Sequence, residues 1–108
     1  MNIQITAKKI EIPSEIRDYA KEKFSKLDKF NPNIQSIEAV IKAEERSVSC
    51  ETIIRLDKHD PIVIEVEGET IQAAVDMAES KAERQLRKSK ERDSVRRRAA
   101  KPEDREMP

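Results

Sequence analysis

Three successive stretches of alternating apolar and polar residues, set between two stretches of helical spacing, restrict the possible folds of this chain more than any other feature. The alternation covers residues 37–43, 48–56 and 62–66, and isoleucine is the commonest residue at the apolar positions. A period of two is typical of strands that bury one face. The connections at 45–47 and 58–61 are short and polar, which favours antiparallel hairpins over helical crossovers. The middle of the chain is therefore predicted to form a three-stranded meander.

A strand and an amphipathic helix are predicted before the meander, and a second helix after it. Residues 2–12 alternate as a strand does, running into a turn or bend. The first helical pattern opens near Ser14, a plausible cap, and should end at the turn residues 31–33. After Gly68, the only glycine, a second apolar arc at helical spacing begins near Thr70. Tyr19, Phe24 and Phe30 are expected mainly in the core.

The resulting order predicts an α+β fold, β-α-β-β-β-α, because each helix has an apolar stripe to bury. The economical arrangement is a four-stranded sheet with two helices packed on one face. This element order is similar to that of a double-stranded RNA-binding domain with an extra strand in front. A length of 108 residues suits a single domain. We expect the folded α+β domain to cover residues 1–93, and residues 94–108 to form a disordered tail, basic and then acidic.

The charged residues, 41% of the chain, balance overall but are sorted along it. Residues 61–80 carry five acidic and no basic side chains, whereas residues 81–101 carry ten basic and three acidic ones. Projection of the second helix at about 100° per residue sorts its charges by face as well. One flank holds Asp76, Glu79 and Glu83, and another holds Lys81, Arg84, Lys88 and Arg92. The basic flank predicts a polyanionic partner, with a merely solvated helix as the simpler alternative.

Side chains suited to catalysis or metal binding are sparse. His59 falls in a polar turn and Cys50 on the apolar side of a strand, so we expect an exposed histidine and a buried structural cysteine. One glycine cannot build a glycine-rich phosphate loop. The acidic side chains are expected to form a solvated patch, Glu65, Glu67, Glu69, Asp76 and Glu79. We expect no enzymatic activity, no metal, no cofactor and no small-molecule substrate.

The longest apolar runs are only a few residues, far short of the roughly 20 that a membrane-spanning helix needs. The first residues lack the pattern of a secretory signal, and a single cysteine cannot form an internal disulfide. We therefore expect a cytoplasmic protein with no membrane partner.

Three segments of the chain are similar, in register, to one known family. They are the opening MNIQIT, the first-helix sequences IRDY and KFSKLDKF, and the second-helix sequences AAVD and ERQLRK. Over roughly residues 1–92 the chain resembles the ribosome hibernation-promoting factors, also known as the ribosome-associated inhibitor or sigma-factor modulation protein family. Long members carry a second, C-terminal domain that dimerises ribosomes, and this chain resembles a short form.

The resemblance implies a domain that binds the small (30S) ribosomal subunit, alone or in the 70S ribosome, in the decoding channel between head and body. There it would block messenger RNA and transfer RNA binding and inhibit translation in stationary phase or stress. Family members use basic side chains of both helices against the 16S rRNA backbone. By position, the implied rRNA-binding residues are Lys23, Lys26, Lys29, Lys81, Arg84, Arg87 and Lys88. The free protein is expected to be a monomer.

Two other functions fit the residues. The chain could be a protein-interaction module that modulates a sigma factor through its acidic side chains. It could also be a general double-stranded RNA binder, for which naked duplex RNA would be a good competitor.

Overall fold

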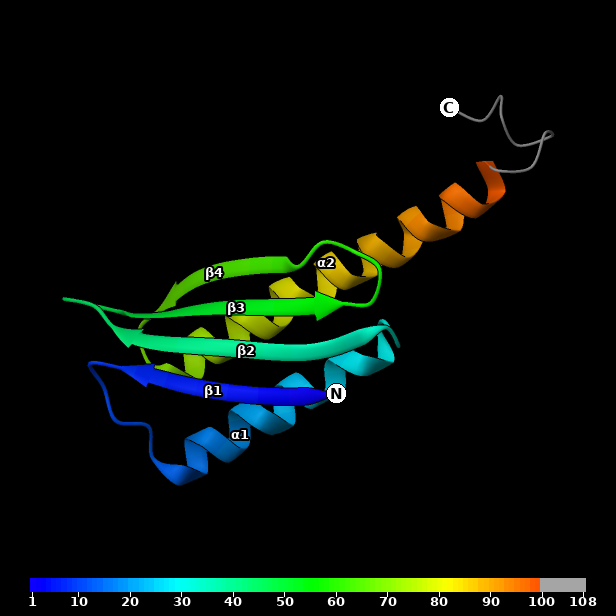
Figure 1. The fold of residues 1–108 in the computed structure, drawn as a ribbon. Helices are drawn as coiled ribbons and strands as arrows, with labels where there is room; N and C mark the ends of the chain where they lie inside the picture. Colours follow the sequence, from blue (N-terminus) through cyan, green and yellow to red (C-terminus); the bar gives the residue numbers. More distant parts are fainter. Residues whose placement is uncertain (100–108) are drawn as a thin grey trace.

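The computed structural model describes residues 1–99, with side chains described as far as Ser89. The elements follow the predicted order (Figure 1). They are β1 (Asn2–Lys8), α1 (Ser14–Ser25), a 3-10 turn η1 (Lys26–Lys29), β2 (Ile34–Ala43), β3 (Val48–Leu56), β4 (Ile62–Gly68) and α2 (Ile71–Ala99).

The four strands form one sheet in the order β1-β2-β3-β4. β2, β3 and β4 pair antiparallel, which confirms the predicted meander, whereas β1 pairs parallel with β2. A parallel pair needs a crossover connection, and α1 provides it. Both helices lie on the same face of the sheet, α1 against β1 and α2 against β3 and β4 (Figure 1). The predicted α+β architecture is therefore confirmed, while the likeness to double-stranded RNA-binding domains stays a prediction.

The core lies between the sheet and the two helices. Every second residue of the strands points into it, and cross-strand neighbours such as Ile37 and Ile54 are both fully buried. Phe24 from α1 and Leu86 from α2 fill the layer from the helical side. Of the three aromatic residues expected in the core, Phe24 is fully buried, while Tyr19 and Phe30 are partly buried and pack against it.

The two helices differ in the hydrogen bonds that their first turns make. The Thr70 hydroxyl caps α2 by accepting a hydrogen bond from the Ala73 backbone N–H at 3.0 Å. Ser14 makes no capping hydrogen bond, so that prediction is wrong. Instead, the backbone carbonyl of Pro13 accepts from the N–H groups of Ile16 and Arg17, both at 3.0 Å.

α2 extends past residue 93, where the domain is expected to end, as far as Ala99 (Figure 1). The sequence contains neither glycine nor proline between Gly68 and Pro102, so nothing in the local backbone preference ends the helix earlier. The rest of the expected tail, residues 100–108, lies outside the described residues.

Candidate nucleic-acid interface

A row of exposed basic side chains follows one flank of α2. The rotation of the helix is set by its buried residues, Ala74, Val75, Ala78, Ala82 and Leu86. Because these residues face the sheet, Lys81, Arg84 and Lys88 are left exposed on the side of the helix away from α1. We call these three residues the basic flank. Their spacing of three and four residues puts one cation on each helical turn.

An open hollow of about 460 Å³ runs along the basic flank, beside the edge strand β4. It is lined by Val66, Asp76, Met77, Ser80, Lys81 and Arg84. We call it the Met77 hollow, because Met77 is one of three large apolar side chains that are exposed among the described residues. The hollow combines an apolar floor with two cations and a hydroxyl.

Arg87, which the family resemblance groups with the same rRNA-binding residues, lies on the other side of α2. Its guanidinium is 3.1 Å from the Glu83 carboxylate and 5.0 Å from the centre of the Phe30 ring. The Lys29 ammonium is 5.3 Å from the same ring. Cation–π contacts with Phe30 thus gather these two cations where η1 meets α2.

Lys26 is exposed at the start of η1, and its ammonium lies 3.9 Å from the Glu22 carboxylate in the last turn of α1. Pairs of this kind between exposed side chains contribute little, typically about 0.3–0.5 kcal/mol. The charge of Lys26 therefore stays accessible to a partner.

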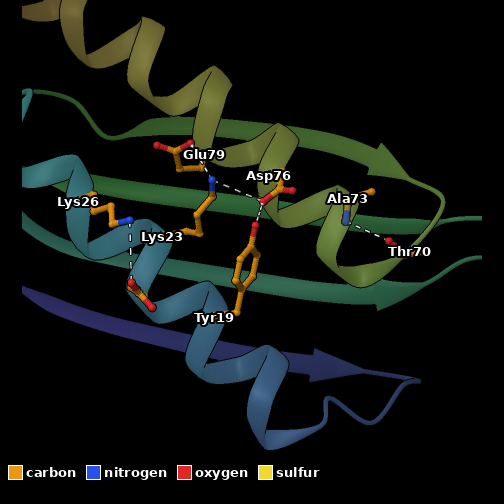
Figure 2. Close-up of polar contacts among 8 residues, drawn as sticks. Tyr19, Lys23, Lys26, Thr70, Ala73, Asp76 and Glu79 are labelled. Carbon is orange, nitrogen blue, oxygen red and sulfur yellow. Dashed lines mark hydrogen bonds and ion pairs between the residues drawn. The ribbon is translucent and has the colours of Figure 1, made fainter.

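Lys23 is held differently, because α2 supplies it with two carboxylates. Its ammonium lies 3.7 Å from Asp76 and 3.8 Å from Glu79, between the two helices (Figure 2). Asp76 also accepts a hydrogen bond from the Tyr19 hydroxyl, and the Lys23 ammonium is 5.9 Å from the Tyr19 ring. We call these four residues the interhelical cluster. Of the residues implied to bind rRNA, Lys23 is the one that the described residues pair with two carboxylates, both from the other helix.

The hydrogen bond to Asp76 raises the pKa of the Tyr19 hydroxyl above its usual value, because the carboxylate disfavours a second negative charge beside it. Burial raises the pKa of the Cys50 thiol, which lies 3.6 Å from the Thr52 hydroxyl in the core. The predicted burial of Cys50 is confirmed.

The acidic side chains expected to form one patch are divided between two faces, so that prediction is wrong. Glu65 and Glu67 alternate with the inward-facing Ile64 and Val66 and are exposed on the face of the sheet opposite the helices. Asp76 and Glu79 lie on the other face. His59, expected to be exposed, is partly buried in the turn between β3 and β4.

The described part of the chain holds no group of three or more His, Cys, Asp or Glu side chains able to bind a metal ion. None of its helices is long and apolar enough to span a membrane.

Most of the chain matches one known protein family. Residues 3–94 match the model of the Sigma 54 modulation protein / S30EA ribosomal protein family. The chain belongs to this family. The resemblance noted from the sequence is thereby confirmed, over almost the same residues.

Two curated relatives share one name. The ribosome hibernation promoting factor of Azotobacter vinelandii is 28% identical over 108 residues, covering 100% of both chains. The factor of the same name from Klebsiella oxytoca is 32% identical over 92 residues, which are 85% of this chain and 96% of that one.

Two solved structures share the fold. The N-terminal domain of Protein Y from Thermus thermophilus superimposes with a TM-score of 0.73 and 26% identity, covering 82% of this chain and 98% of that one. A ribosomal subunit interface protein from Coxiella burnetii reaches a TM-score of 0.77 at 22% identity, covering 83% and 98%.

Sequence reasoning identified the basic flank but missed three other features of the helical layer. The first is the Tyr19 to Asp76 hydrogen bond, the second the Phe30 ring shared by two cations, and the third the Met77 hollow. The helical projection carried a partial signal for the first, since it put Asp76 and Glu79 on the flank opposite the basic one. The hollow depends on β4, which the projection of a single helix does not include.

Proposed function

We propose that this chain is a ribosome hibernation factor that binds the small (30S) subunit in its decoding channel. There it would exclude messenger RNA and transfer RNA and so inhibit translation in stationary phase or stress. In this proposal the protein acts in the cytoplasm, as a monomer when free, and it needs neither a cofactor nor a catalytic step. Its partner is the 16S rRNA, in the free subunit or in the 70S ribosome.

The observation that carries the proposal is the basic surface of the helical layer. The basic flank and Arg87 of α2, together with Lys26 and Lys29 of η1, gather cations on the same side of the sheet. Cations one turn apart on a rigid helix can contact successive phosphates, and arginine adds bidentate contacts. Folded RNA is recognised largely by shape and backbone, which suits such a surface. The names of the relatives support the ribosome as the target.

The test is co-sedimentation of the purified protein with 30S subunits and 70S ribosomes, with and without excess transfer RNA. Binding should be stoichiometric, weakened by transfer RNA, and weaker at about 200 mM than at about 50 mM salt. The logarithm of affinity should fall with the logarithm of salt concentration by about 0.7–0.9 per neutralised phosphate.

The variant K81E/R84E/K88E should abolish binding and leave the fold intact, because all three side chains are exposed. The matched control is R46E/R55E/K58E, which makes the same change of charge at exposed residues outside both helices. This control should bind to within a few fold of the parent protein. If both variants bind equally well, or equally poorly, the basic flank is not the contact surface.

The same experiment separates the other candidate functions. A general double-stranded RNA binder would be displaced from subunits by naked duplex RNA, whereas a binder of the decoding channel should not be. A sigma-factor modulator would stay at the top of the gradient and capture a protein partner in an RNase-resistant complex.

A further inference from the structure

The Met77 hollow has a composition that phosphate contacts alone do not require. Met77 is 46% exposed on α2, and Val66 of the edge strand β4 is partly buried beside it. A surface that binds only the RNA backbone needs cations and hydrogen-bond donors, as the rest of the basic flank offers. An exposed thioether next to two of those cations adds an apolar contact of another kind.

The cations at the hollow are free to serve a ligand. Lys81 and Arg84 are both exposed, and neither forms an ion pair with another residue that the structure describes. Met77, Lys81 and Arg84 follow one another at spacings of four and three residues, so they form a single stripe with the thioether at its N-terminal end. Ser80 also lines the hollow and adds a hydroxyl.

One carboxylate also lines the hollow, and it is occupied elsewhere. Asp76 accepts the Tyr19 hydrogen bond and lies 3.7 Å from the Lys23 ammonium (Figure 2). The interhelical cluster therefore draws this negative charge toward α1, away from the cations. The part of the hollow near Lys81 and Arg84 is left with an excess of positive charge.

Building on the proposed function, we propose that the Met77 hollow takes one unstacked nucleotide of RNA, its base against Met77 and Val66 and its phosphate on Lys81 and Arg84. A nucleotide joins a flat apolar ring to an anion, and the hollow joins an apolar floor to two cations. Thioether sulfur makes favourable contacts with aromatic rings, and a guanidinium plane stacks on a base. Unpaired bases are the parts of folded RNA that proteins most often take up in this way. The volume of about 460 Å³ lies within the range of ligand sites, roughly 300–1,000 Å³.

The test compares two kinds of contact by their response to salt. M77Q keeps the length and helix preference of the side chain but removes its apolar end, and it should weaken 30S binding by about 3- to 10-fold. The slope of affinity against salt should not change, because no phosphate contact is lost. K81Q should reduce that slope by about one. M77L keeps an apolar side chain and should bind to within about 3-fold of the parent.

A photo-crosslinking diazirine analogue of methionine at position 77 identifies what fills the hollow. A crosslink to an rRNA base, read as a stop of reverse transcription at one nucleotide, supports the proposal. Crosslinks to ribosomal protein alone, or M77Q binding like the parent, overturn it and leave the proposed function standing.

A second probe, a fluorescent single-stranded RNA of about 12 nucleotides, separates failure of this inference from failure of the proposed function. Binding of this RNA that M77Q weakens, without any binding to subunits, would refute the ribosomal target and keep the nucleotide site. Binding to neither probe refutes both proposals.

Discussion

Replacing Gly68 by alanine tests how closely the end of β4 approaches the first turn of α2, and hence what positions the basic flank. A Cβ at residue 68 would lie 2.7 Å from the Ala74 nitrogen and 3.0 Å from both the Ala73 carbonyl carbon and the Ala74 Cα. These are backbone atoms, so no side-chain rotation relieves the contact. The first turn of α2 must shift against the sheet to accept one methyl group.

The expected loss of stability is the difference between two opposing effects. Overpacking of a well-packed interior costs about 1–3 kcal/mol. Alanine also restricts the unfolded chain, which stabilises the folded state by about 0.4–1 kcal/mol. The net destabilisation should be about 1–2 kcal/mol, which lowers the Tm of a domain of this size by about 5–15 °C.

Thermal unfolding followed by far-ultraviolet circular dichroism measures this shift directly. The double variant G68A/A73G tests the stated cause, because removing the Ala73 methyl cannot relieve contacts made by backbone atoms. It should be no more stable than G68A. A Tm within about 2 °C of the parent, or rescue by A73G, would refute the packing argument.

Three further outcomes are expected. K26Q should reduce the salt slope of 30S binding by about one, whereas K23Q should not, because Asp76 and Glu79 already neutralise Lys23. Equal slopes for the two variants in gradient sedimentation would show that the interhelical cluster does not keep Lys23 from the RNA. T70A should cost about 1 kcal/mol, seen as a Tm lower by about 4–8 °C, because it removes the cap of α2. Stability should fall as the pH rises through and above about 9, since the folded pKa of Cys50 is raised and its thiol ionises first in the unfolded chain. Tyr19 adds to this loss from about pH 10. Tm values measured from pH 7 to 11 should decline less in C50A and Y19F than in the parent, and identical profiles would show that neither group is responsible.

Periodicity predicted the fold well because the burial of a strand or helix residue depends on its position within its own element. Cys50, Ile54 and Ile64 are buried where the period of two put them. The prediction was less accurate at the ends of the first helix, because backbone geometry determines which hydrogen bonds form there. The carbonyl of Pro13 does what Ser14 was expected to do, and the first helix tightens into a 3-10 turn from Lys26.

The basic flank was also predictable, because three side chains on one helix need only the pitch of that helix to be aligned. Arg87 was assigned to the same group from the family resemblance, yet it faces η1 and the Phe30 ring. Helical pitch alone gives the angle between residues and does not say which neighbouring element each angle meets.

The sequence by itself determined the order of the elements, the residues that fill the core and the separation of acidic from basic side chains on α2. All three follow from spacing along the chain. Only the tertiary structure decided that Tyr19 and Lys23 meet Asp76, and that Met77 lies beside Val66 at the sheet edge. Tyr19 and Asp76 are 57 residues apart, and their contact exists because both helices pack on one face of the same sheet. That packing leaves Lys23 neutralised within the protein and the basic flank exposed to a partner.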